Sequence, residues 1–194
     1  AAARLRTLAP DEIRRRLDDR FRLLTTGPRT APRHQTLRAV VDWSWDLLDD
    51  PERALARRLS VFSGGATEEA ALRVCGLGDA TLDVLTALVE KSLLVAAPGD
   101  PTRYRMLETI REYAAQRLDE AGERATVEAA HAALVVELVE TAEPRLRRAN
   151  QLEWVARLRA EADDVAAELR RAIATGDAAT AQRLVAGSAW FWFI

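Results

Sequence analysis

The chain of 194 residues contains a single cysteine and two histidines. Cys75 has no partner within the chain, which excludes an internal disulfide and fits a reducing compartment. His34 and His131 lie far apart in the sequence, and neither has another metal-binding residue at ligand spacing. We therefore predict that Cys75 and His131 are structural core residues, and we expect neither a metal centre nor nucleophilic catalysis.

Long apolar runs are absent as well. No run is long enough to cross a bilayer, and the first residues, "AAARLRTLAP", lack the apolar core of a signal peptide. These absences predict a soluble, cytoplasmic protein. The chain begins without Met and ends on "AWFWFI", an aromatic cluster that a natural terminus rarely exposes to water. We expect it to be a segment of a larger protein.

Lysine is almost absent, since Lys91 is the only one. It lies in "VEKSLL" with no glycine before it, so the chain lacks the GxxxxGK[ST] loop that holds nucleotide phosphates. We predict that these residues contain no complete enzyme active site. The net charge is only -2, but residues 1–62 carry 13 arginines against 9 acids, and residues 63–194 carry 15 basic against 21 acidic residues. The excess of positive charge therefore lies in the N-terminal residues 1–62.

The first part of the chain is predicted to be helical. Apolar residues at helical spacing indicate a helix that starts near Pro10. The next stretch, "TTGPRTAPRHQT" (residues 25–36), holds a glycine and two prolines and is predicted to be a loop. Thr36 is placed to cap the helix that follows, and Asp49 or Asp50 to cap another. We expect one of the two tryptophans in "WSWDLL" to pack inside the module and the other to meet a neighbouring element, because residues two apart cannot share a helix face.

The middle of the chain changes from helices to a hairpin. A short helix is predicted between Thr67, its cap, and Gly76, its end. A longer helix over residues 79–94 follows. Its buried stripe is predicted to consist of Leu82, Leu85, Val89 and Leu93. Two short strands around a Pro-Gly-Asp-Pro turn then lead into a helix at Glu108. Helices followed by such a hairpin predict a winged helix built on a helix-turn-helix.

From Glu123 to the end the pattern is all helical. Three helices are predicted, with Asn150 and Gly176 marking the breaks between them. The connections are short, which favours antiparallel stacking.

A winged helix raises the hypothesis of DNA binding through its second helix. Asp79, Asp83 and Glu90 outnumber Lys91 there, whereas a helix in the major groove needs cations near the phosphates. We therefore favour a winged helix that serves as a packing element or a lever. The residues that favour DNA or another phosphate are Arg103 and Arg105 of the wing and Arg29, Arg33, His34 and Arg38 before it.

Several stretches in order carry a family resemblance: "WSWDLL", "LARRLSVFSGGATEEAA", "LTALVEKSLLV" and "RYRMLETIREYA". Together they resemble the winged-helix region of STAND-class nucleotide-binding proteins, which include the NB-ARC regulators. The likeness is closest to bacterial transcriptional regulators of the antibiotic-regulator and large LuxR type. "AAARLR" is similar to the helix after the GLPLA-type segment of that family, and "EWVARLRAEADD" is similar to the start of its TPR-like array.

The resemblance implies three parts. Residues 1–35 would end the small helical domain of an ATPase module, residues 36–121 would form the winged-helix domain, and residues 122–194 would begin the array. It also implies an upstream P-loop domain in the parent protein that binds ADP or ATP, with no nucleotide bound by this fragment alone. The array would receive a protein or small-molecule effector, and DNA would be contacted through another domain.

The corner between the wing and the next helix bears on nucleotide sensing. Met106, Leu107 and Glu108 stand where many members of this family carry a Met-His-Asp triplet whose histidine contacts the ADP phosphate. Leucine cannot donate a hydrogen bond, so the resemblance leaves Arg33, His34 and Glu108 as candidate nucleotide-facing residues. An acid at a helix start is equally explained by capping and by the helix dipole, and we favour that structural interpretation of Glu108.

The sequence thus predicts a mainly α fold, a winged helix with a small β-hairpin followed by an antiparallel, TPR-like helical array. The predicted function is a switch segment that couples a nucleotide-binding domain to a helical sensor array in a transcriptional regulator. The alternative is direct DNA binding by the winged helix, and a third interpretation is a pure scaffold.

Overall fold

The computed structural model describes residues 31–194, with side chains for Arg38 and from Val40 onward. The chain divides into two compact units, Ala1–Leu48 and Asp49–Ile194, which are described separately. The predicted helix near Pro10 and the side chains of Arg29, Arg33 and His34 lie outside the described residues.

The first unit contributes helix α3 (Ala31–Asp46). The prediction of a loop up to a cap at Thr36 is wrong for its last part, because α3 already begins at Ala31. Pro32 is compatible with this start, since the first helical turn does not use the N–H that proline lacks. Trp45 is 6% exposed, which confirms that one of the two tryptophans is buried, whereas Trp43 is 66% exposed and is not covered by a neighbouring element of the described residues as expected.

The second unit contains the rest of the described helices and strands. In chain order these are α4 (Asp50–Arg58), the 3-10 turn η2 (Leu59–Val61), β1 (Ala66–Thr67), α5 (Glu68–Cys75), η3 (Gly78–Ala80), α6 (Thr81–Glu90), β2 (Val95–Ala97), β3 (Arg103–Arg105), α7 (Glu108–Glu120), α8 (Arg124–Ala142), η4 (Glu143–Arg145), α9 (Gln151–Ala160), α10 (Ala162–Thr175) and α11 (Ala178–Phe193). We call α4 to α7 the winged helix and α8 to α11 the helical region.

The caps of the winged helix follow the sequence closely. Asp49 accepts a hydrogen bond from the Glu52 backbone N–H, and the Glu52 carboxylate accepts one from the Asp49 N–H, which makes a capping box at the start of α4. Thr67 caps α5 and Gly76 ends it in the left-handed conformation, as predicted. Cys75 is buried in the core, as expected, and burial raises the pKa of its thiol to about 12.

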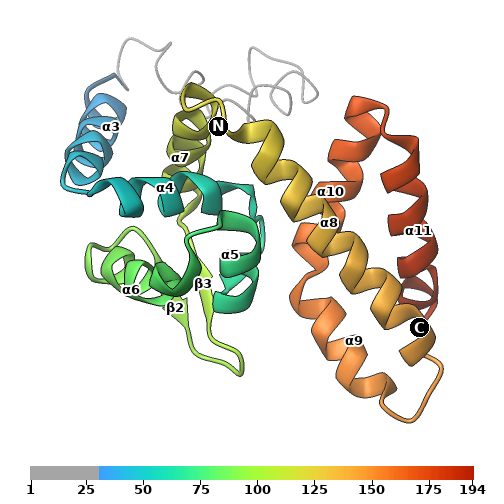
Figure 1. Ribbon diagram of the computed structural model, residues 1–194. Helices are drawn as coiled ribbons and strands as arrows, with labels where there is room; N and C mark the ends of the chain where they lie inside the picture. The colour runs from blue at the N-terminus through green and yellow to red at the C-terminus, as the bar shows by residue number, and fades with distance from the viewer. Residues whose placement is uncertain (1–30) are drawn as a thin grey trace. The chain divides into compact units, whose positions relative to one another are not determined.

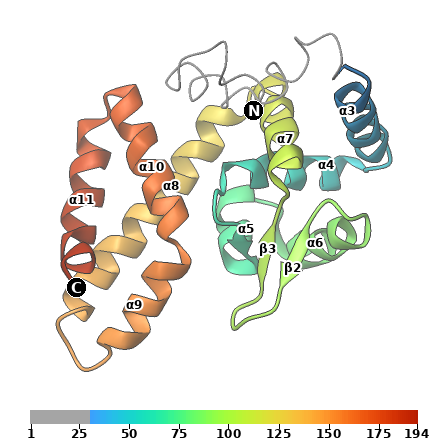
Figure 2. The ribbon, with the colours of Figure 1, turned by 180° about the vertical axis from the view of Figure 1, so that it is seen from behind.

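The sheet is small and antiparallel, with strand order β1-β3-β2. Val95 pairs with Arg105 and Ala97 with Arg103, so the predicted hairpin is confirmed. β1 was not predicted, because two residues are too short to show an alternating pattern. Figures 1 and 2 show the hairpin projecting beside α6. The predicted winged helix and the mainly α fold are therefore confirmed.

The buried face of α6 differs from the prediction. Leu85 and Leu93 are buried, but Leu82 is 42% exposed and Val89 is only partly buried. The buried positions of the helix are Thr81, Val84, Leu85 and Leu88. The prediction carried the helical period through Leu93, whereas the helix ends at Glu90 and the period ends with it.

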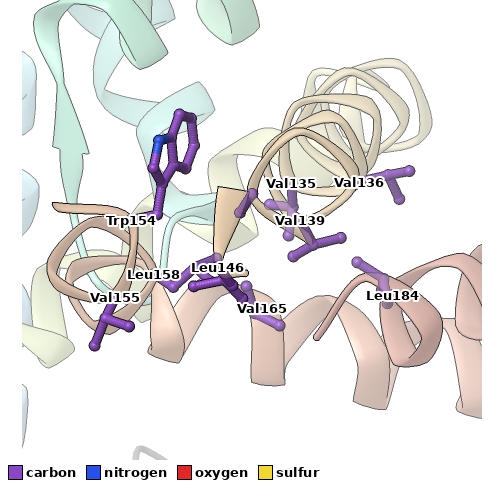
Figure 3. Packing of buried hydrophobic residues seen from close by; sticks show 10 residues of the cluster. Val135, Val136, Val139, Leu146, Trp154, Val155, Leu158, Val165 and Leu184 are labelled. Atoms are coloured by element: carbon purple, nitrogen blue, oxygen red, sulfur yellow. The ribbon is translucent and has the colours of Figure 1, made fainter. Parts of the chain in front are cut away.

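The helical region packs around a core shared by all of its helices. Its buried residues include Val135 and Val139 of α8, Trp154 and Leu158 of α9, and Leu184 of α11. Figure 3 shows these side chains gathered between the helices, with Trp154 and Val155 pointing to opposite sides of α9. The breaks at Asn150 and Gly176 are confirmed. The prediction of one continuous helix between them is wrong, because the chain leaves helical geometry at Glu161 and divides there into α9 and α10.

Candidate functional site

A loop of the winged helix is held by a buried carboxylate of the helical region. The loop follows η2, and its Ser63 N–H donates to Asp164 Oδ1 at 2.6 Å while its Gly64 N–H donates to Asp164 Oδ2 at 3.2 Å. Asp164 lies on α10 and is 1% exposed. A Cβ added at Gly64 would lie 3.0 Å from Asp164 Oδ2, so the close approach favours glycine. This contact joins segments 100 residues apart in the sequence.

The same carboxylate faces a buried histidine. Nε2 of His131 lies 3.5 Å from Asp164 Oδ1, and Nδ1 lies 3.4 Å from Glu168 Oε1. The Phe62 ring meets the imidazole edge to face at a centroid distance of 4.7 Å. Arg171 donates to Glu168 at 2.6 Å. His131 was predicted to be a structural residue and it is buried, but the sequence analysis did not anticipate its two carboxylate partners.

These carboxylates set the protonation of the histidine. Burial by itself lowers the pKa of His131, but the adjacent Asp164 and Glu168 outweigh it and raise that pKa to about 9. Burial raises the pKa of Glu168, and His131 and Arg171 more than reverse this, so its pKa lies below the usual value. The cluster is therefore a charged one at neutral pH, with a histidinium between two carboxylates.

The stability of the chain should fall as pH rises through this titration. A raised histidine pKa means that the folded state holds a proton that the unfolded state releases, so the stabilisation is complete below pH 6.5 and is lost as the pH approaches about 9. The full effect is about 3 kcal/mol, from 1.36 kcal/mol per pKa unit. Urea unfolding at pH 6, 7.5 and 9 measures it. A free energy of unfolding that stays constant between pH 6.5 and 9 would contradict this assignment.

Arg103 of β3 binds the same loop through a backbone carbonyl. Its guanidinium donates to the Gly65 carbonyl at 2.6 Å and pairs with Glu161 at the break between α9 and α10. The Arg103 side chain is only 11% exposed. Gly65 has φ +83°, and an added Cβ would lie 2.6 Å from the Tyr104 carbonyl oxygen, so this position requires glycine. We call Asp164, His131, Glu168, Arg103 and Glu161 the junction cluster.

A second ionic group lies at the start of α8. Glu123 accepts hydrogen bonds from Arg57 at 2.8 Å and from Arg58 at 2.9 Å. Hydrogen bonds from the two guanidinium groups lower the pKa of Glu123 to about 2. Because Arg58 also donates to the Cys75 carbonyl at 2.6 Å, this group ties α4, α5 and the α7–α8 connection together.

The predicted nucleotide-facing corner is ordinary in its contacts. Leu107 is the N-cap residue of α7 and is 59% exposed. Glu108 pairs with Arg111 of its own helix at 2.7 Å. The place of Glu108 in the first turn of α7 fits the helix-dipole part of the structural interpretation, whereas the N-cap residue of α7 makes no side-chain hydrogen bond; these contacts do not test nucleotide sensing. Within residues 31–194, no group of His, Cys, Asp or Glu has the arrangement of a metal site.

The sequence carried a signal for the junction cluster that was missed. Asp164 and Glu168 are four residues apart on α10, and Val165 and Ala172 of the same helix are also buried. Two acids on one buried face require a buried cation, because burying an unpaired carboxylate is costly. His131 was the available candidate, although the sequence does not indicate which cation meets which acid.

Comparison with known proteins agrees with this architecture. A family profile described as "Winged helix-turn-helix domain" matches residues 48–119. These residues form a winged helix-turn-helix domain. A Mycobacterium tuberculosis protein named "Putative HTH-type transcriptional regulator" is 41% identical over 200 residues, covering 100% of this chain and 22% of that protein. A Mycobacterium bovis protein of the same description matches equally. An uncharacterized M. tuberculosis protein is 44% identical over 131 residues, 63% of this chain and 33% of its own length.

The chain therefore spans about a fifth of the length of the regulators that it matches. None of the solved structures gives a significant match. Within the described residues, no helix is long and apolar enough to cross a membrane.

Helix α6, the second helix of the helix-turn-helix, is acidic on its exposed side. Asp79, Asp83 and Glu90 lie on or beside α6 and are exposed. Lys91 at its end donates to both carboxylate oxygens of the buried Glu52 at 2.6 Å. The helix that would enter a DNA groove thus presents three acids, and its neighbouring cation has a carboxylate partner.

Proposed function

We propose that this chain is the coupling segment of a transcriptional regulator, in which the winged helix-turn-helix domain passes the state of the helical region to the rest of the protein. The observation that carries the proposal is the junction cluster. Asp164 binds the backbone of the Ser63–Gly64 loop, and Arg103 of the wing binds Glu161. A polar contact that is buried and charged has defined made and broken states, which is what a switch between two parts requires.

The nucleotide in this proposal comes from the resemblance to STAND-class regulators. An upstream P-loop domain would bind ADP or ATP, and the helical region would receive the effector. In this scheme the segment has no catalytic step of its own. Its contribution is mechanical, because a change in the helical region reaches the Ser63–Gly64 loop through Asp164 and the wing through Glu161.

Direct DNA binding by the winged helix-turn-helix domain is the second candidate, and the comparisons favour it. The family profile and the regulators' description both name the HTH type, which often reads DNA. The local charges favour coupling instead. Arg103 pairs with Glu161 and donates to the loop carbonyls. Arg105 is therefore the exposed arginine of β3.

Binding of the 194-residue chain to a duplex at low salt separates the two candidates. Coupling predicts no retention beyond that of a control protein of equal net charge, and Arg105→Ala should change nothing. Salt-dependent retention that Arg105→Ala weakens would establish DNA binding by the wing and overturn coupling as the main function. Arg105 is the informative position, because Arg103→Ala would also break the junction cluster.

Amide hydrogen exchange tests the coupling directly. In the intact chain the Ser63 and Gly64 amides should be protected by Asp164, and Asp164→Asn should speed their exchange about tenfold or more. The same substitution in the complete regulator should change transcription from a target promoter in the absence of effector. Faster exchange together with unchanged transcription would refute the coupling role while leaving the structural contact intact.

A further inference from the structure

A pocket of about 120 Å³ opens between the winged helix and the helical region. Its walls include Thr67 and Ala70 from the winged helix and Leu134, Leu138 and Trp154 from the helical region. An apolar cavity of about 150 Å³ holds benzene, and this pocket is of comparable size and opens to solvent, which suits a compact organic molecule. Asp164 and His131 of the junction cluster form part of its lining.

Two hydrogen-bond donors in the lining have no acceptor within the described part of the chain. His131 is 3% exposed, and its Nε2 is in ion-pair contact with Asp164 Oδ1 at 3.5 Å but makes no hydrogen bond. Arg157 lies over the Trp154 ring at 5.1 Å, and its guanidinium bonds to no carboxylate of residues 38–194. An unpaired donor on a fully buried side chain is costly unless a ligand or water meets it.

Three of the four acids in the same lining already accept hydrogen bonds. Glu137 accepts from Arg73 at 2.5 Å, Glu161 pairs with Arg103, and Asp164 accepts from the Ser63–Gly64 backbone. The remaining acid, Glu69, is exposed, and its charge adds to the effect of Glu137 in raising the pKa of Arg73. The buried Nε2 of His131 is therefore the lining group that lacks a hydrogen-bond acceptor, although the lining includes four acids.

We propose that this pocket binds a small organic carboxylate with a compact apolar body. The carboxylate would accept hydrogen bonds from Arg157 and from Nε2 of His131, and the apolar part would contact Leu134, Leu138 and Trp154. Arginine is suited to the contact, because its planar guanidinium matches a carboxylate with two parallel hydrogen bonds.

Because Thr67 and Ala70 of the winged helix line the same pocket, such a ligand would also touch the winged helix. It would bind the closed junction more tightly than the open one, and by linkage it would stabilise the closed state in proportion to that difference. This regulatory consequence rests on the proposed coupling function. The binding itself does not, so the two are tested by different measurements.

The probes are 3-methylbutanoate and two analogues of the same shape, the neutral 3-methylbutanamide and the cationic 3-methylbutylamine. Titration of the 194-residue chain is followed by NMR at the Ala70, Leu134 and Trp154 indole signals. We expect saturable shifts with the carboxylate, about tenfold or more weaker binding of the amide, and no binding of the amine. Equal binding of all three probes, preference for the amine, or no saturation by the carboxylate at millimolar concentration would overturn the proposal.

Variants locate the site. Arg157→Gln should weaken carboxylate binding about tenfold or more, because a charge-assisted hydrogen bond pair is lost. Arg159→Gln is the matched control, since Arg159 is exposed on the same helix and does not line the pocket. Both positions are on the surface, and the NMR spectrum confirms that each variant is folded. Equal effects of the two variants, or none from Arg157→Gln, would refute the site. Binding that persists while Asp164→Asn leaves transcription unchanged would refute the coupling function alone.

Discussion

Replacing Asp164 by asparagine should lower the free energy of unfolding by about 3 kcal/mol, within the range observed when one partner of a buried ion pair is removed. The isosteric amide keeps an oxygen for one backbone N–H, but it loses the charge that Ser63, Gly64 and His131 share. His131 would respond by titrating at lower pH, so the variant should also lose part of the stability change between pH 6.5 and 9. Urea unfolding at several pH values measures both effects.

Asp163→Asn provides the control for this experiment. Asp163 precedes Asp164 on α10 and carries the same charge, but it is exposed. Its replacement should change the free energy of unfolding by less than about 0.5 kcal/mol, as is usual for surface positions. If the two variants were equally stable, the junction cluster would contribute nothing to the fold and the argument from burial would fail.

Gly187→Ala should destabilise the helical region by about 3 kcal/mol, at the upper end of the range for an overpacked core. An added Cβ would lie 2.7 Å from Val139 Cγ2 and 2.9 Å from the Val139 carbonyl carbon. Val139 is fully buried, so it has no free space to move into, and α8 and α11 would have to separate. Thermal unfolding monitored by circular dichroism measures the loss.

Ala186→Ser is the matched control, because Ala186 is exposed one position earlier on α11. It should leave the unfolding temperature within a degree or two of the parent chain, since a surface change of this kind is worth less than about 0.5 kcal/mol. A stable Gly187→Ala variant would mean that the two helices are not held at the observed distance in solution.

Local signals in the sequence predicted much of the fold. Thr67, Gly76, Asn150 and Gly176 each mark a helix end through capping or turn chemistry that acts within a few residues. The hairpin was predicted for the same reason. The error at Thr36 came from taking Pro32 as part of a loop, although proline fits the first turn of a helix. The errors at Leu82 and at the α9–α10 break concern how far a periodic pattern extends, and neighbouring packing decides that.

The junction cluster could not be predicted in the same way. Its contacts join Ser63 to Asp164 and Arg103 to Glu161, positions that are 101 and 58 residues apart. Arg103 illustrates the difficulty, because a wing arginine looks like a phosphate contact in the sequence and proves to be paired inside the protein. Pairing partners at such separations depend on tertiary packing, which the order of residue types does not show.

The loop held by Asp164 also has an evolutionary consequence. The Gly64 N–H donates to Asp164 of α10, and the Gly64 and Gly65 carbonyls accept from Arg103, so neither an insertion nor a larger residue fits there. The hairpin tip, residues 98–102, is exposed and carries no such constraint. Related proteins should therefore vary in length at the tip and stay constant in length between Phe62 and Ala66.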